Sequence, residues 1–260
     1  MARVNPTPPL WRESRMGLEL ASLVRDGVFR GRGVTDGGGQ PVLLIPGFLA
    51  GDNSLGVMAR WLKGTGHHPS RAGIRANVAC SAKSIDRLEE RLEALVERQG
   101  RRAAIVGHSR GGGFAKCLAV RRPDLVSGIV TMGSPNREPL GVHPLVRANV
   151  EAVATLGRLG VPGMFTRECL GGACCEDFWA QCAGPTPPDV GYVSIYSRTD
   201  GVVDWRACLD EGADHVEVRS SHCGMAVHAD VYRAVADALT GFRTLDTGRR
   251  ALAPVAAQAA

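Results

Sequence analysis

Apolar and polar positions alternate along the chain in two distinct patterns. Short, uninterrupted apolar runs at 42–45, 103–106 and 129–132 are typical of strands that are covered on both faces. Residues 192–197 and 215–219 indicate two more strands. Apolar residues at helical spacing predict helices at 84–97, 110–121, 144–159 and 228–239. Strands that alternate with helices predict an α/β fold with a mostly parallel central sheet and helices on both faces.

One domain at 40–242 carries this alternation, and the segments outside it differ. Residues 1–39 predict a helical extension, with an apolar stripe of Met16, Leu20, Leu23 and Val24. We expect this stripe to pack on the core, although arginines beside it are also typical of a helix that contacts a membrane surface or a partner. Residues 136–190 interrupt the rhythm with a Gly-, Cys- and Pro-rich passage, which predicts a cap insertion. Residues 243–260 predict a flexible tail.

Composition excludes several classes of protein. The 260 residues are 44% hydrophobic and 22% charged, as in an ordinary folded protein, so disorder throughout is excluded. The net charge of +5 is spread along the chain, and no nucleic-acid partner is expected. No apolar run approaches the ~18 residues that a membrane-spanning helix needs. Residues 1–28 lack the order of a signal peptide, so the expected location is the cytoplasm.

The strongest chemical signal is the pentapeptide Gly-His-Ser-Arg-Gly at 107–111. It falls between a predicted strand and a predicted helix, where a strained turn would lift the hydroxyl of Ser109 above the carboxyl edge of the sheet. The flanking glycines leave room for so sharp a turn. Ser109 is therefore the expected nucleophile.

A serine hydroxyl needs a base, and the base needs an orienting acid. Asp200 and His222 each come three residues after a predicted strand, and the order Ser, Asp, His is the one that this architecture uses. Asp204 and His228 are the competing acid and base. We expect His108 to point away from Ser109.

The negative oxygen of a tetrahedral intermediate needs hydrogen-bond donors. The backbone N–H groups of Arg110, directly after the nucleophile, and of Phe48, after the first core strand, are in the expected positions. Apolar residues beside the predicted active face are candidates for an acyl-binding pocket. These are Leu49, Met164, Phe165, Phe178, Trp179 and Met225.

With these motifs, residues 40–241 resemble the α/β-hydrolases of the bacterial esterase and lipase group. The resemblance implies the α/β-hydrolase fold and a small-molecule substrate, a carboxylic (acyl) ester, which is hydrolysed through an acyl-enzyme. It gives Ser109, His222 and Asp200 as the triad and requires no metal or organic cofactor. An acyltransferase or a thioesterase with the same acyl-enzyme is the alternative, and a non-catalytic binding protein of this fold is a third. The chain has Pro46-Gly47 where many relatives have His-Gly. The Cys-rich cap is not part of the core pattern of the family, so the identity of the substrate does not follow from the resemblance.

The cysteines of the cap can be interpreted in more than one way. The spacings of Cys169, Cys174, Cys175 and Cys182 fit no zinc-site pattern, so no metal ligand is predicted. A disulfide within the cap and free buried thiols both remain open. We expect a disulfide between Cys208 and Cys223, which follow the Asp200 and His222 loops. Cys80 and Cys117 are expected in the core.

Overall fold

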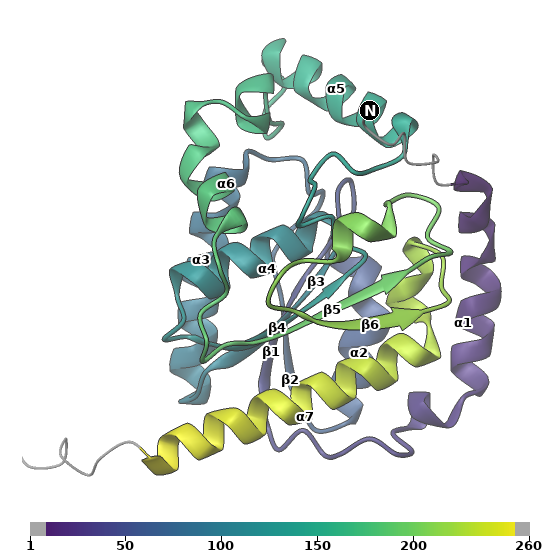
Figure 1. Cartoon of the computed structure of the whole chain (residues 1–260), viewed down its shortest axis with the longest axis vertical. Coiled ribbons are helices and arrows are strands. Elements are labelled where there is room, and N and C mark those ends of the chain that lie inside the picture. Colours follow the sequence, from purple (N-terminus) through teal and green to yellow (C-terminus); the bar gives the residue numbers. More distant parts are fainter. Residues whose placement is uncertain (1–8, 253–260) are drawn as a thin grey trace, which may run out of the picture.

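A single parallel sheet forms the centre of the molecule (Figure 1). The computed structural model describes residues 9–252. Six strands lie in the order β2-β1-β3-β4-β5-β6, and every neighbouring pair is parallel. They are β1 (Pro41–Ile45), β2 (His68–Arg71), β3 (Ala103–His108), β4 (Val126–Met132), β5 (Gly191–Ser197) and β6 (Asp214–Val218). Because all strands are parallel, their carboxyl ends share one edge of the sheet.

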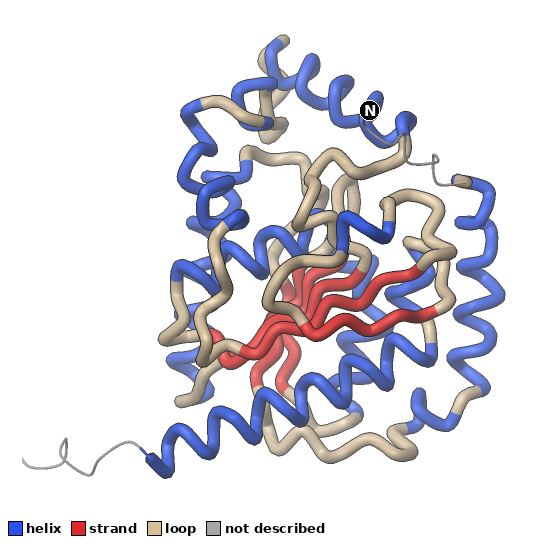
Figure 2. The backbone as a smooth tube through the Cα atoms, in the orientation of Figure 1, coloured by secondary structure: helices blue, strands red, loops and turns tan. Residues whose placement is uncertain are grey.

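Helices cover both faces of the sheet, as Figure 2 shows in blue around the red strands. Alternate residues of β1 face opposite sides: Val42 and Leu44 belong to one core, and Leu43 and Ile45 to the other. The first core is completed by α1 (Met16–Arg25), α2 (Gly56–Gly64) and α7 (Ala229–Leu252). The second is completed by α3 (Ser81–Gln99), α4 (Arg110–Arg121) and α6 (Glu176–Ala183). The predicted α/β fold with helices on both faces is confirmed.

The segment between β4 and β5 forms the cap. It holds α5 (Pro144–Arg158), the short 3-10 helices η4 (Arg167–Leu170) and η5 (Ala173–Cys175), and α6. Figure 1 shows α5 at the far end of the molecule from the amino ends of the central strands. Val153, Ala154 and Phe165 of the cap form a small apolar cluster, against which Phe48 and Val78 of the main domain also pack. The cap therefore lies over the edge where the strands end.

The N-terminal extension is helical, but it docks differently from the expectation. It consists of η1 (Leu10–Arg15), α1 and η2 (Gly27–Arg30), and residues 1–8 lie outside the described residues. Of the predicted apolar stripe only Leu23 is buried, because the side of α1 that faces the protein also carries the buried carboxylate of Glu19. The prediction that the whole stripe packs on the core is therefore wrong, since the side chains of Met16, Leu20 and Val24 are exposed.

One strand and two α-helices were not predicted, and the last helix runs longer than predicted. β2 is polar and largely exposed, and α2 and α6 were not identified from the sequence. The last helix continues to Leu252, well into the segment predicted as a flexible tail. Arg102 binds Asp246 of this helix at 2.6 Å, which holds the extra turns against the domain. The tail prediction is wrong for 243–252, and 253–260 lie outside the described residues.

Three further 3-10 helices complete the secondary structure. They are η3 (Asp52–Leu55), η6 (Trp205–Cys208) and η7 (Cys223–Val227). Among residues 9–252 there is no helix with the length and apolar character needed to cross a bilayer.

Candidate active site

Ser109 occupies a strained turn between β3 and α4. Its backbone has φ 54° and ψ −122°, a conformation that costs a residue with a Cβ about 1–3 kcal/mol. The turn is tight: a Cβ on Gly107 would lie 2.4 Å from the Gly111 carbonyl oxygen, and a Cβ on Gly111 would lie 2.2 Å from that of Ile45. Glycine is therefore required at both positions of the motif, and the predicted elbow is present.

His222 and Asp200 form a buried pair at the carboxyl ends of β6 and β5. The His222 Nδ1 atom lies 2.7 Å from Asp200 Oδ2, and each residue is 4% exposed. The second oxygen, Oδ1, accepts the backbone N–H groups of Val202 and Val203 at 2.7 and 2.8 Å. Because Oδ2 is a carboxylate acceptor, Nδ1 carries the proton, and Nε2 of the neutral ring is left as an acceptor.

The charges around His222 decide its protonation. Burial lowers the pKa of His222, but the charge and hydrogen bond of Asp200, helped by the charge of Glu13, outweigh burial. The net effect raises the pKa of His222 above its ordinary value. The imidazole is thus a stronger base than a histidine in water.

Two glycines lie in close contact with Ser109 and with the His222–Asp200 pair. A Cβ on Gly47 would lie 3.0 Å from the Ser109 Cβ, and a Cβ on Gly133 would lie 3.0 Å from His222 Nδ1. Ser109 N donates to the carbonyl of Met132, the residue before Gly133, at 2.8 Å. Within residues 9–252 the hydrogen bonds join His222 to Asp200 but not to Ser109. Contacts between a nucleophile and its base are often loose before a substrate binds.

His108 supports the histidine loop from beneath. Its Nε2 donates to the backbone carbonyl of His222 at 3.0 Å, and the centroids of the two rings are 4.8 Å apart. Burial and the neighbouring charge of His222 lower the pKa of His108 to about 3, so its ring stays neutral. His108 is thus buried and bound to the His222 main chain, as expected for a residue that does not serve the nucleophile directly.

Two glutamates of the N-terminal extension hold the same loop, and the sequence analysis missed both. Glu13 accepts the N–H groups of Gly201, His222 and Cys223 at 3.0, 2.9 and 2.8 Å. Glu19 accepts the N–H and the hydroxyl of Ser221 at 2.7 and 2.6 Å. Glu13 therefore ties the Asp200 loop to the His222 loop, and Glu19 fixes the residue before His222. No sequence motif marks either glutamate.

The expected oxyanion donors lie on either side of Ser109. Arg110 is the first residue of α4, where a backbone N–H has no acceptor within the helix. Phe48 lies on the turn after β1, next to Gly47, which abuts Ser109. Leu49 follows with φ 61°, and Leu49 and Ser109 are the two non-glycine residues of 9–252 that have a positive φ. The turn after β1 and the turn after β3 thus each contain one strained non-glycine residue.

Solved structures share this architecture. A lipase of Bacillus licheniformis in its mature form superposes with a TM-score of 0.56 at 14% identity, over 77% of this chain and 91% of the lipase. A soluble variant of the monoglyceride lipase of Saccharomyces cerevisiae, in complex with a substrate analog, gives 0.54 at 15% identity, over 84% and 88%. The monoacylglycerol lipase of Paleococcus ferrophilus gives 0.53 at 14% identity, over 78% and 96%. The chain has the α/β-hydrolase fold. No protein-family model and no curated protein sequence matches it.

Ser109 lines an apolar cavity of this α/β-hydrolase-fold chain. The cavity has a volume of about 160 Å³. Phe165, Phe178 and Trp179 of the cap line it together with Phe48, so three of the six predicted pocket residues are in place. The other three are elsewhere. Leu49 is exposed, Met164 packs in the cap core, and Met225 is fully buried in the core between the sheet and α7.

Arg110 extends its side chain across this cavity wall. Its guanidinium lies 5.2 and 5.3 Å from the ring centroids of Phe114 and Phe165. It donates to the carbonyls of Asn77 and Ala79 at 2.8 and 2.7 Å, and to Ser81 Oγ at 3.1 Å. Burial lowers the pKa of Arg110 to about 10, which leaves the group charged at neutral pH. The side chain of Arg110 thus holds the loop that precedes α3.

The competing acid and base have other partners. Asp204 accepts the N–H of Arg206 at 3.0 Å and caps η6, and His228 Nδ1 accepts the N–H of Asp230 at 3.2 Å. Neither takes part in the His222–Asp200 pair. The hydrogen bonds therefore favour Asp200 and His222 over both alternatives.

The predicted disulfide between Cys208 and Cys223 is not formed, because both residues are free thiols. Cys208 is buried behind the Asp200 loop with Val203 and Ala207. Cys223 is exposed and its backbone binds Glu13 on the side of the N-terminal extension. The two loops meet through Asp200 and His222, so no covalent bridge is needed to hold them.

Proposed function

We propose that this α/β-hydrolase is a serine esterase that cleaves small carboxylic esters. The observation that carries the proposal is the strained Ser109 in the wall of an apolar cavity. Strain of this kind persists where the surrounding structure presents a reactive group. The buried His222–Asp200 pair supplies the base and its orienting acid at the same edge of the sheet.

In the proposed reaction, Ser109 Oγ attacks the ester carbonyl carbon while His222 Nε2 takes the hydroxyl proton. The carbonyl oxygen becomes an oxyanion, and the N–H groups of Phe48 and Arg110 stabilise it. The intermediate collapses with loss of the alcohol, which receives the proton from His222. Water then repeats the sequence on the acyl-enzyme and releases the acid. Asp200 holds the imidazole and stabilises its charged form throughout.

The cavity favours a short to medium acyl group. Apolar side chains dominate its wall, which suits a hydrocarbon chain better than a charged one. Its volume of about 160 Å³ is smaller than the ~300–1,000 Å³ of pockets for drug-sized ligands. The lipases and monoacylglycerol lipases that share the fold act on ester bonds by name, and this supports an ester as substrate.

Labelling with a fluorophosphonate probe tests the proposal. We expect the wild-type protein to react at Ser109 and the Ser109→Ala variant to remain unlabelled, with ester hydrolysis lower by roughly 10⁴–10⁶-fold. Ser127→Ala is the matched control, because Ser127 is a buried serine at the amino end of β4 whose hydroxyl has no partner among the described residues. Equal labelling of wild type and Ser109→Ala would refute the proposal. Adding a competing alcohol to the same assay separates hydrolysis from acyl transfer.

A further inference from the structure

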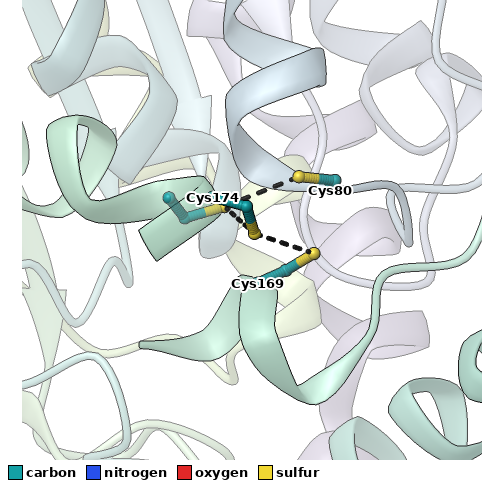
Figure 3. A group of neighbouring side chains, drawn as sticks. Cys80, Cys169 and Cys174 are labelled. Carbon is teal, nitrogen blue, oxygen red and sulfur yellow. Dashed lines mark hydrogen bonds between the residues drawn. The ribbon is translucent and has the colours of Figure 1, made fainter. Parts of the chain in front are cut away.

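Four thiols converge at the junction between the cap and the main domain. They belong to Cys80, Cys169, Cys174 and Cys175 and are called the thiol cluster below. Their Sγ atoms all lie within 4.8 Å of one another. Figure 3 shows Cys80, Cys169 and Cys174 pointing toward a common centre from separate segments of the chain. The cluster lies outside the catalytic machinery described above.

The separations suit a tetrahedral metal site. The closest contacts, 3.5 Å for Cys80–Cys175, 3.6 Å for Cys169–Cys174 and 3.7 Å for Cys174–Cys175, link all four sulfurs. Four sulfurs at about 2.3 Å from one zinc ion are about 3.8 Å apart along each edge of the tetrahedron. Two separate disulfides would need only two close pairs and would not require all four sulfurs to share one centre.

The backbone around the cluster is shaped to bring the ligands together. Gly172 N donates to the Glu168 carbonyl at 2.7 Å, which folds the segment from Cys169 to Cys174 back on itself. A Cβ on Gly172 would lie 2.7 Å from that same oxygen, so this fold requires glycine. On the other side, Cys80 is the N-cap residue of α3, where the helix dipole stabilises a thiolate.

Charge gives a second, independent argument. The Arg110 guanidinium binds the Ala79 carbonyl and Ser81 Oγ, that is, both neighbours of Cys80. Its partners among residues 9–252 are neutral oxygens and aromatic rings, and no carboxylate pairs with it. A charge held in this way needs a counter-charge nearby. Four thiolates around a divalent cation carry a net charge of −2, whereas two disulfides carry none.

We propose that the thiol cluster binds one zinc ion as a structural Cys₄ site. Binding converts four thiols to thiolates and releases their four protons to the solvent, and no redox step is involved. Because all four positions are taken by protein ligands, the ion supplies no open site for chemistry. It joins η4 and η5 of the cap to the start of α3. Cys169 also lines the cavity, so the ion fixes one wall of the substrate pocket.

Metal analysis of the purified full-length protein tests this proposal without any activity assay. We expect one zinc ion per chain when the protein is prepared with a thiol reductant and without a chelator. A mercurial reagent should release that zinc, and Co²⁺ in its place should show the visible absorption of a tetrahedral tetrathiolate site. Iron in place of zinc, or no metal uptake by the reduced wild-type protein, would overturn the assignment.

Cys174→Ser and Cys223→Ser form a matched pair, because both cysteines are exposed and only the first belongs to the cluster. We expect Cys174→Ser to lose at least about 10-fold in zinc affinity and Cys223→Ser to keep the wild-type zinc content. Equal zinc affinity in the two variants contradicts the proposal. So does an intact mass of the wild-type protein that shows two disulfides and no metal. Since neither measurement involves ester hydrolysis, the zinc site and the proposed esterase can fail separately.

Discussion

Replacing Glu13 with glutamine tests whether the N-terminal extension positions His222, the proposed base. The glutamate accepts three backbone N–H groups, two on Oε1 from Gly201 and His222 and one on Oε2 from Cys223. A glutamine of the same shape keeps an oxygen for the first two. Its amide group then places a donor opposite the third, the Cys223 N–H, which loses its acceptor.

The size of the effect follows from these contacts. Hydrogen bonds to a charged acceptor contribute about 1.5–3 kcal/mol, and those to a neutral acceptor about 0.5–1.5 kcal/mol. Glu13 is half-buried and Cys223 is exposed, so water can accept part of the hydrogen bonding that the Cys223 N–H loses. We expect the loop that carries His222 to be destabilised by about 1–2 kcal/mol, or roughly 5–30-fold in its opening equilibrium.

Two measurements check the Glu13→Gln prediction. Amide hydrogen exchange at His222 and Cys223 should accelerate by the factor given above. The charge of Glu13 contributes to the raised pKa of His222, so its removal should lower that pKa and move the acid limb of the kcat/KM profile to lower pH. Glu97→Gln, an exposed position on α3, is the control and should change neither. An unchanged acid limb together with unchanged exchange in Glu13→Gln would show that the Glu13 hydrogen bonds do not position His222.

The remaining predictions concern the base, the acid, the pocket and the fold. The pKa of His222 is raised and the base must be neutral, so kcat/KM should fall as the pH drops through a value above ~6.5; a half-point near pH 5 contradicts this. Asp200→Asn should lower kcat by about 10⁴-fold, and Asp204→Asn far less; equal losses would contradict the pairing. Among p-nitrophenyl esters, rates should peak between acetate and octanoate, and a maximum at palmitate would contradict the cavity size. Lys116→Met should destabilise the protein by about 3–5 kcal/mol in denaturant unfolding, because it leaves Asp210 buried without its 2.6 Å ion pair; a loss below 1 kcal/mol would contradict it.

Burial explains which parts of the fold the sequence predicts. β1, β3 and β4 are buried along their whole length, and continuous apolar runs are the consequence of cover on both faces. β2 is an edge strand with the sequence His-Pro-Ser-Arg and is mostly exposed, so no apolar pattern marks it. Its pairing with β1 is set by the neighbouring strand and not by its own composition.

The same reasoning separates the predictable part of the site from the rest. Ser109, Asp200 and His222 were identifiable as candidates because each follows a recognisable strand and the glycines around Ser109 have steric causes. Glu13 and Glu19 were not, because they act on residues about two hundred positions away through backbone N–H groups, which any sequence supplies. The pocket prediction failed for Met225 because η7 turns that side chain into the core. Proximity in sequence to the active edge does not fix the direction of a side chain.

The spacing of the cap cysteines did not reveal the thiol cluster, because the cluster depends on the topology of the fold. The spacing rule was applied to Cys182, the nearest cysteine in sequence, but α6 turns this thiol toward the Gly113 carbonyl at 3.3 Å, away from the other three. The fourth sulfur comes from Cys80, 95 residues before Cys175. Cys80 precedes α3, and the cap leaves the sheet after β4, so in a parallel sheet both segments start from the carboxyl edge. Ligands in such a fold are therefore better sought among residues that follow neighbouring strands than among residues that are close in sequence.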